Sequence, residues 1–348
     1  MPDSSQTQPV AFNCEGGLVK NRSTFLMQPG EALVLENFEP DVEGGYRRMN
    51  GFRKFVNQIV PQTSSSSERV IGVANFANKV IAARGEKIYN AASSELAAAI
   101  LINETMSGSG VIKIDSVLGF TSSGTVQINS EAFTYTGINA AVSPNELTGV
   151  TRAASSTTEA AHLGNVVVST SWTQIDTGRT NAAKYRFERF NYNNTDKIVF
   201  VDEVNAPVVF DSSFNAVDVS NSAVSGSKFI ASFKDHMFYA GKSTTPEELV
   251  FSIPFDEDDF TSGNGAGSIR VDDTITGIKV FRDSLFIFCE NRIFKLTGSS
   301  SSDFAIQAVT RSIGCINGDT IQEFGGDLIF LGPDGLRTVA ATARIDDT

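Results

Sequence analysis

The sequence predicts an all-β protein: a β-propeller of about five blades with a small inserted β module and an extended N-terminal arm. Short runs rich in Val, Ile and Phe alternate with Gly, Asn and Asp, which is typical of many short strands joined by turns. An aromatic frame also recurs, and its last four copies lie about 43 to 48 residues apart, the length of a four-stranded blade. Each copy contains apolar runs separated by turn residues, which is the content that a blade requires.

Residues 1–60 form the expected arm. Gly16-Gly17 and Pro29-Gly30 interrupt the segment, and the apolar runs at 32–38 and 46–49 predict two strands. The arm has too much Gly and too many polar residues for a core of its own, so we expect its apolar side chains to be buried elsewhere. These side chains are Leu33, Leu35, Phe38, Phe52 and Phe55.

The arm also concentrates positive charge in an acidic chain, at Arg47, Arg48 and Arg53. Complementary charge sets the register of an interface more than its affinity. We therefore expect these three arginines to meet an adjacent subunit or a neighbouring protein.

Residues 61–104 and 171–348 form the expected propeller. In the frame, an aromatic residue is followed by a polar or Gly turn, and an apolar run begins four residues later in most copies. We expect each aromatic to begin one blade and to lie in its core, at Phe76, Phe190, Phe233, Phe281 and Phe324. The run that ends at Cys289 is apolar on both faces, as in a strand packed between sheets, so Cys289 is interpreted as a small core hydrophobe.

Residues 105–170 form the expected insertion, because the interval from Phe76 to Phe190 is too long for one blade. Alternating apolar and polar residues at 111–114, 125–128 and 132–135 predict strands, and Ser, Gly and Asn separate them. Loop insertions of this kind are places where rigid scaffolds display contact surface.

Composition excludes several classes of protein. Asp and Glu total 40 against 28 Lys and Arg, a formal charge of −12, which argues against an exposed basic face that grips nucleic acid. Three scattered cysteines suggest neither a disulfide framework nor a zinc site, and we expect no metal and no cofactor. No uncharged apolar run of membrane-spanning length is present, and no signal peptide is recognisable.

Several segments resemble a known family. The pattern around Gly16-Gly17-Leu18, Leu35-Glu36-Asn37 and 44–52 is similar to the opening of tail tubular protein B, nozzle or stabilisation proteins of tailed bacteriophages. The segments 275–298 and 328–335 resemble the propeller part of the same proteins. The insertion is similar to a small β module that recurs in phage virion proteins.

The resemblance implies a structural part of the virion, made in the host cytoplasm. Subunits would form a homo-oligomeric ring, usually of six, in the tail or neck, in contact with other virion tail proteins. DNA would pass through the ring without specific binding, and the protein would not be an enzyme. Members of the family are often longer, so the resemblance leaves open a complete nozzle or a shorter ring component.

Candidate chemical sites are few. Gly241-Lys242-Ser243 lacks the earlier glycine of a phosphate-binding loop, and the acidic run 256–259 lacks the glycine of a calcium loop. Residues 263–267 lack the strand and helix of a dinucleotide site. His162 and His236 are the only histidines, and both fall in predicted turns, so no catalytic residue is assigned.

Two alternatives to the virion protein remain. One is a propeller that binds carbohydrate or protein, as a receptor-binding or adhesin-like module does. The other is a glycosidase, whose paired carboxylates would come from distant blades. Experiment can distinguish the three. Ring assembly would indicate the virion protein, glycan binding by a monomer the binding propeller, and polysaccharide turnover the glycosidase.

Overall fold

The computed structural model describes residues 16–20, 23–28, 30–40, 45–49, 51, 53–62, 68–102, 104–181 and 184–346. The chain divides into two compact units, residues 1–54 and 55–348. Phe52, one of the arm residues singled out above, lies outside the described residues.

The N-terminal unit consists of two small sheets. β1 (Gly17–Leu18) pairs in parallel with β2 (Glu31–Ala32), and the short 3-10 helix η2 (Thr24–Leu26) lies between them in sequence. β3 (Phe38–Pro40) pairs antiparallel with β4 (Tyr46–Arg48). None of the described residues of this unit is buried.

Besides the sheet of the insertion, the described part of residues 55–348 contains five small antiparallel sheets, which are numbered in sequence order. The first sheet holds β5 (Val70–Phe76), β6 (Lys79–Arg84), β7 (Lys87–Ala91) and β15 (Thr173–Asp176). The second holds β16 (Arg186–Tyr192), β17 (Thr195–Val201), β18 (Val208–Asp211) and β19 (Ala216–Asp218). The third holds β20 (Phe229–Phe233), β21 (His236–Lys242), β22 (Thr245–Phe251) and β23 (Gly267–Arg270), with η3 (Ser262–Asn264) before the last strand.

The fourth sheet holds β24 (Ile275–Phe281), β25 (Ser284–Cys289), β26 (Ile293–Thr297) and β27 (Ala305–Thr310). The fifth has only three strands, β28 (Gln322–Phe324), β29 (Asp327–Gly332) and β30 (Gly335–Thr338), with η4 (Gly318–Thr320) before them. Helix α1 (Val339–Asp346) follows β30 and packs against β29 and β27.

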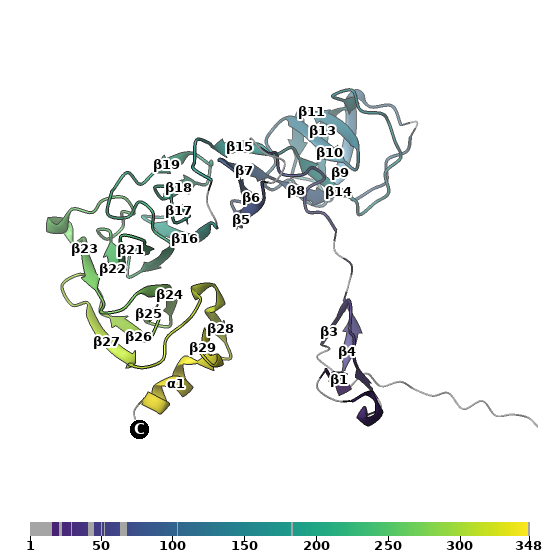
Figure 1. Cartoon of the computed structure of the whole chain (residues 1–348). Coiled ribbons are helices and arrows are strands. Elements are labelled where there is room, and N and C mark those ends of the chain that lie inside the picture. Colours follow the sequence, from purple (N-terminus) through teal and green to yellow (C-terminus); the bar gives the residue numbers. More distant parts are fainter. Residues whose placement is uncertain are drawn as a thin grey trace, which may run out of the picture. The chain divides into compact units, whose positions relative to one another are not determined.

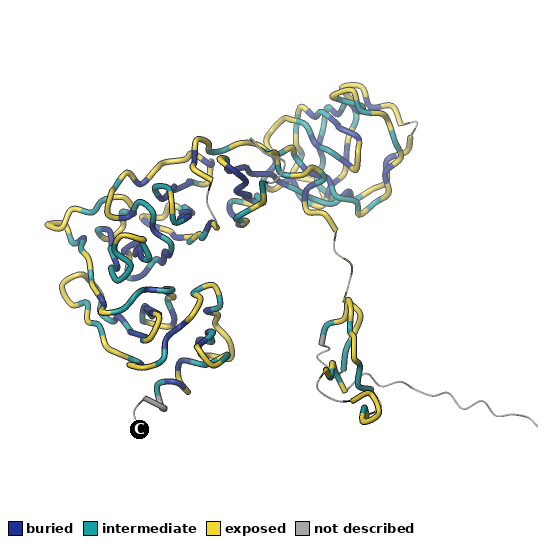
Figure 2. Tube along the Cα trace, in the orientation of Figure 1, coloured by how far each residue is buried: buried dark blue, intermediate teal, exposed yellow. Residues whose placement is uncertain are grey.

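The five sheets follow one another around an arc that is open between the first and the fifth (Figure 1). Successive sheets pack face to face, with clusters of buried side chains at their junctions. The buried residues are dark blue in Figure 2. The strands that begin the sheets, β5, β16, β20 and β24, contact one another in that order along the inner side of the arc. The prediction of an all-β, propeller-like fold is confirmed.

The phenylalanine frame marks the end of the innermost strand and not the beginning of the blade. Phe76, Phe233 and Phe281 are the last residues of β5, β20 and β24, and Phe190 lies two residues before the end of β16. The two residues after each of these strands form a tight turn, and at least the first of them has positive φ, as at Ala77-Asn78 and Asn193-Asn194. The aromatic frame therefore marks a hairpin, and the sequence pattern does not indicate the strand that ends near the aromatic.

The expected core position is wrong for one of the five phenylalanines. Phe76, Phe190, Phe233 and Phe281 are buried, whereas Phe324 is 72% exposed at the end of β28. The physical reason is that the first four aromatics lie against an adjacent sheet, whereas no sheet of the described residues packs against the face of β28 that carries Phe324.

The insertion is a seven-stranded sheet between the third and fourth strands of the first sheet. Its strands are β8 (Ser93–Glu95), β9 (Ser107–Ile114), β10 (Gly124–Ile128), β11 (Glu131–Tyr135), β12 (Gly137–Asn139), β13 (Asn145–Ala154) and β14 (Val167–Thr170). Its sheet begins earlier than the expected boundary at residue 105, because β8 pairs with β14. Its apolar core draws only on residues 92–168.

Candidate functional site

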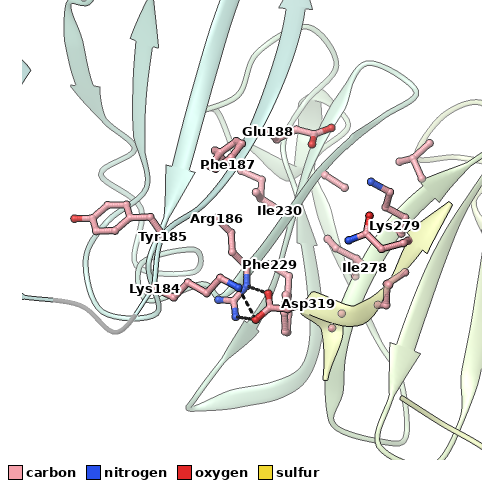
Figure 3. Close-up of a pocket in the computed structure, with 16 residues that line it drawn as sticks. Lys184, Tyr185, Arg186, Phe187, Glu188, Phe229, Ile230, Ile278, Lys279 and Asp319 are labelled. Carbon is pink, nitrogen blue, oxygen red and sulfur yellow. Dashed lines mark hydrogen bonds and ion pairs between the residues drawn. The ribbon is translucent and has the colours of Figure 1, made fainter. Parts of the chain in front are cut away.

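A hollow within residues 55–348 lies on the inner side of the arc. It has a volume of about 380 Å³ and is lined by β16, β20, β24 and the η4 turn, which come from the second to the fifth blades (Figure 3). This hollow is called the inner cleft below. The first strand of each of these sheets lies on the inner side of the arc. Residues far apart in sequence therefore meet in the inner cleft.

One end of the inner cleft is held by an ion-pair network centred on Arg186. Its guanidinium donates to both carboxylate oxygens of Asp319, with Nε–Oδ1 2.9 Å and Nη2–Oδ2 3.2 Å. Arg186 Nη1 also lies 2.9 Å from Glu203 Oε1, and Lys184 Nζ lies 2.8 Å from Asp319 Oδ2. The ring of Phe229 stacks below the guanidinium, 5.1 Å from its Cζ. This network joins the second blade to the turn before the fifth.

Burial by itself would raise the pKa of Asp319, but Arg186 and Lys184 hold that pKa below its usual value. The carboxylate is therefore ionised, and its oxygens are occupied by two cations. Asp319 in this state holds blades together and is poorly suited to act as a nucleophile or proton donor.

A second carboxyl group lines the inner cleft further along β16. The backbone amide of Ser232 donates to Glu188 Oε1 over 3.3 Å, and Lys279 lines the same hollow (Figure 3). Burial raises the pKa of Glu188, and the hydrogen bond from Ser232 and the nearby positive charge of Lys279 only partly offset this. Glu188, Lys279 and the exposed ring of Phe187 are the groups through which the inner cleft could contact a ligand.

The two histidines are not part of the inner cleft. His236 is buried in the third blade, where its Nδ1 lies 2.6 Å from the Ser252 carbonyl and its ring packs edge-on against Phe251 and Phe304. His162 is buried in the insertion beside Glu131. The structure therefore places them in different modules and gives each a packing partner.

The other sequence candidates are structural. Gly241, with φ +76°, lies at an irregularity of the β21–β22 hairpin, and Gly265, with φ +104°, ends the η3 turn. In the acidic run, Glu257 is buried and pairs with Lys197 of the second blade at 2.5 Å. Among the residues that the structure describes, no group of three or more His, Cys, Asp or Glu side chains is placed to hold a metal ion.

The three arginines that we expected at an interface lie in or beside the N-terminal unit's second sheet. Arg47 and Arg48 are on β4, where Arg47 Nε donates to Glu39 Oε1 on β3 over 2.8 Å. Arg48 and Arg53 are exposed.

Sequence reasoning missed two charged clusters, the Arg186 network and a buried group in the insertion. In the latter, Arg152 donates to both oxygens of Glu131 at 2.9 Å, and His162 Nε2 lies 2.8 Å from Glu131 Oε2. The available signal was a charged residue inside an otherwise apolar strand pattern, at Glu131 and Arg152. Their pairing could not be read without the fold.

Comparisons with known proteins add little. No family model matches the chain, and no curated protein matches it. Among solved structures, it is similar to a phage phi92 endosialidase, with TM-score 0.36 and 14% identity over 76% of this chain and 52% of that one. It is also similar to the extracellular domain of a putative one-component system from B. thetaiotaomicron, with TM-score 0.33 and 9% identity over 79% of this chain and 38% of that one.

A third similar structure is that of BBS1N in complex with ARL6DN, with TM-score 0.31 and 8% identity over 77% of this chain and 76% of that one. The chain thus matches about half of the endosialidase and less of the second protein. At these scores the likeness carries no argument about function. Within the described part of the chain, no helix has the length and apolar character needed to cross a bilayer.

Proposed function

We propose that this chain is a structural subunit of a bacteriophage tail or neck, and that copies of it form a ring or tube through which DNA passes. The observation that carries the proposal is the N-terminal unit. None of its described side chains is buried, and several large apolar side chains are exposed. Phe25 is 96% exposed, and Leu26, Val34 and Phe38 are exposed as well. Apolar surface of this extent is a feature of protein interfaces.

Charge supports the same function. A channel for DNA should not retain its cargo, and a net charge of −12 disfavours contacts with phosphate. In the inner cleft, Lys184 and Arg186 are engaged by Asp319 and Glu203, which reduces the positive charge available to a polyanion. The family resemblance of the N-terminal and propeller segments agrees with this function.

The experiment is to determine the assembly state of the purified chain by native mass spectrometry and negative-stain electron microscopy. We expect closed rings with a central opening, and no retardation of double-stranded DNA at physiological salt. Arg48→Glu should weaken assembly, more at low salt than at high salt. Arg48 is a better test position than Arg47, because a negative charge at residue 47 would also repel Glu39 within the same unit. A monomer at every concentration would contradict the proposal.

A carbohydrate- or protein-binding propeller is the second candidate, and the inner cleft favours it. Glu188, Lys279 and Phe187 offer a carboxyl, an ammonium and an apolar ring, the mixture with which polar ligands are held. Binding of a glycan by a stable monomer, abolished by Glu188→Ala and retained by the distant Glu159→Ala, would support this alternative. Glycoside turnover in the same assay would indicate an enzyme.

A further inference from the structure

A second hollow lies where the insertion adjoins the first blade (Figure 1). It has a volume of about 320 Å³ and is called the polar groove below. One wall comes from β6, β7 and the start of β15, and the other comes from the start of β10 and the turn before it. A Cβ atom on Gly119 of that turn would lie 2.4 Å from the Asn78 carbonyl oxygen, so the insertion and the β5–β6 hairpin approach each other closely at this groove.

Asn90 is the buried amide of the polar groove. The strand register places it between Ile81 of β6 and Thr173 of β15, on one face of the first sheet. Asn90 is only 3% exposed, yet its side chain forms no hydrogen bond with any residue that the structure describes. Buried amides normally have a partner in the protein or a bound molecule. Asn90 therefore presents an unused donor and an unused acceptor to the groove.

Lys79 is the charged side chain among the described residues that line the groove. It is partly buried and forms no ion pair with a carboxylate in the described ranges. Its ammonium lies 5.2 Å from the centre of the Phe214 ring, which holds the charge in place without neutralising it. Burial lowers the pKa of Lys79, because no counter-charge offsets the loss of water. An anionic group in the groove would supply that counter-charge.

Three hydroxyl groups complete the lining, from Thr125 on β10, Ser171 before β15 and Thr173 on β15. Their hydroxyls make no hydrogen bond to the described part of the chain. Hydroxyl and amide groups both donate and accept hydrogen bonds, as the hydroxyls of a sugar do, whereas inorganic phosphate offers mainly acceptors. The lining therefore matches a ligand that carries one negative charge and several hydroxyls.

We propose that the polar groove binds an acidic sugar, with the sugar carboxylate at Lys79 and the sugar hydroxyls at Asn90, Thr125, Ser171 and Thr173. The volume of about 320 Å³ lies at the small end of ligand pockets and suits a single sugar ring. The groove is separate from the inner cleft, and this inference goes beyond the proposed function, because a ring subunit needs no saccharide.

The test uses glucuronate as the probe, titrated into the full chain and followed by calorimetry and NMR. We expect a dissociation constant of about 1 mM, an ordinary affinity for a ligand of this size. Glucose lacks the carboxylate and acetate lacks the hydroxyls, so each should bind at least about 10-fold more weakly. Lys79→Gln should reduce the affinity for glucuronate to that for glucose. Lys87→Gln changes the same charge on β7 outside the groove and is the matched control.

Asn90→Leu separates binding from a structural role. The substitution removes an amide without a partner and changes the side-chain volume little, so the temperature of thermal unfolding should be unchanged or higher. The affinity for glucuronate should fall at least about 10-fold, because the ligand loses its hydrogen bonds to the amide. A less stable Asn90→Leu variant that binds glucuronate as before would show that Asn90 serves the fold, and would overturn the inference.

Three further results would overturn it. One is no binding of glucuronate at about ten times the expected dissociation constant, which would leave the groove to water alone. Another is displacement of glucuronate by phosphate at equal affinity, which would indicate a plain anion site. The third is loss of binding in Glu188→Ala with binding retained in Lys79→Gln, which would place the sugar in the inner cleft.

The outcome is independent of the assembly experiment. Closed rings that do not bind glucuronate would contradict the acidic-sugar site and leave the proposed function standing. A monomer that binds glucuronate through Lys79 and Asn90 would support the site and contradict the ring.

Discussion

A buried carboxylate, Glu131, anchors loops of the insertion. Glu131 is fully buried and accepts hydrogen bonds from Arg152, His162 and the backbone amides of Ala153 and Ala160. Asn129 Nδ2 lies 3.2 Å from His162 Nδ1, which fits an imidazole that donates to Glu131 through Nε2. Arg152 in turn donates to the carbonyls of Leu101 and Glu104, so one ionic cluster fixes two loops of the module.

Glu131→Gln should destabilise the insertion by about 3 to 5 kcal/mol, because it leaves the Arg152 charge buried without a counter-charge. The measurement is thermal or urea unfolding followed by circular dichroism. Glu159→Gln is the matched control, since Glu159 is half exposed and lies 3.9 Å from Arg152. Its effect should stay below about 1 kcal/mol. Equal losses of unfolding free energy in the two variants would show that the buried Glu131–Arg152 pair stabilises the insertion no more than the exposed Glu159 does.

Acid should weaken the same module. Burial alone would raise the pKa of Glu131, but hydrogen bonds from Arg152, His162 and Ala160 lower it from 4.5 to about 2. A carboxyl whose pKa is lower in the folded state contributes stability that is complete above its unfolded pKa and is lost as the pH falls toward the folded one. We expect stability of the insertion to fall between about pH 4.5 and pH 2, and this loss to be absent in Glu131→Gln.

Two thiols give a further prediction at this scale. Cys289 and Cys315 are buried, and burial raises the pKa of both. The thiolate is the reactive form. In a Cys14→Ser background, neither should react with a chromogenic disulfide until denaturant unfolds the chain, as followed by absorbance. Rapid labelling of the folded protein would contradict the interpretation of Cys289 as a core residue, which the sequence alone predicted from its apolar strand.

At the scale of elements, tight hairpin turns recur after the first strands of the sheets. Asn193 and Asn194 have φ of +52° and +61°, and Lys234 and Asp235 have +48° and +62°. Two-residue hairpin turns with positive φ match the twist of the strands they join. The sequence revealed these turns through Asn, Asp and Gly, but it did not reveal the strand before each aromatic. In β16, exposed polar residues alternate with buried ones, which obscures the strand pattern.

Asn194→Val should cost about 1 to 2 kcal/mol, because a β-branched residue is strained at positive φ. Asn194→Gly removes the same side chain without that strain, so its stability should remain close to that of the unmodified protein. Asn194 is exposed, and packing does not complicate the comparison. Chemical unfolding of both variants provides the measurement, and equal stability of Val and Gly at this position would refute the turn geometry.

At the scale of the whole molecule, composition and repeat spacing predicted the fold class, because each blade carries its own hairpin signal in sequence. They could not predict which faces are covered. Phe324 is exposed because no sheet of the described residues packs on its side of β28, and Arg186 meets Asp319 because the arc of sheets curves. Both are properties of the blades together, so no local pattern encodes them.

The insertion should be removable as a unit, with ends that the fold now defines. Thr170 N donates to the Ala92 carbonyl over 2.9 Å, and β15 pairs with β7 directly beyond this point. Deleting residues 93–169 and joining Ala92 to Thr170 should therefore close a short hairpin between β7 and β15. The core of the insertion shares no residue with the blade cores, so the five blades should keep their packing.

This deletion should loosen the segment before the first blade. Asn57 anchors that segment to the insertion through its backbone amide to Ser169 Oγ and through its side chain to the carbonyls of Gln127 and Val167. We expect the shortened chain to unfold cooperatively with an all-β circular dichroism spectrum, and protease to cut near residue 57 more rapidly than in the full chain. Asn57→Ala in the full chain should reproduce the increased cleavage without loss of the insertion. If the shortened chain is unfolded while Asn57→Ala is folded, the insertion is part of the propeller core and the boundaries at Ala92 and Thr170 are wrong.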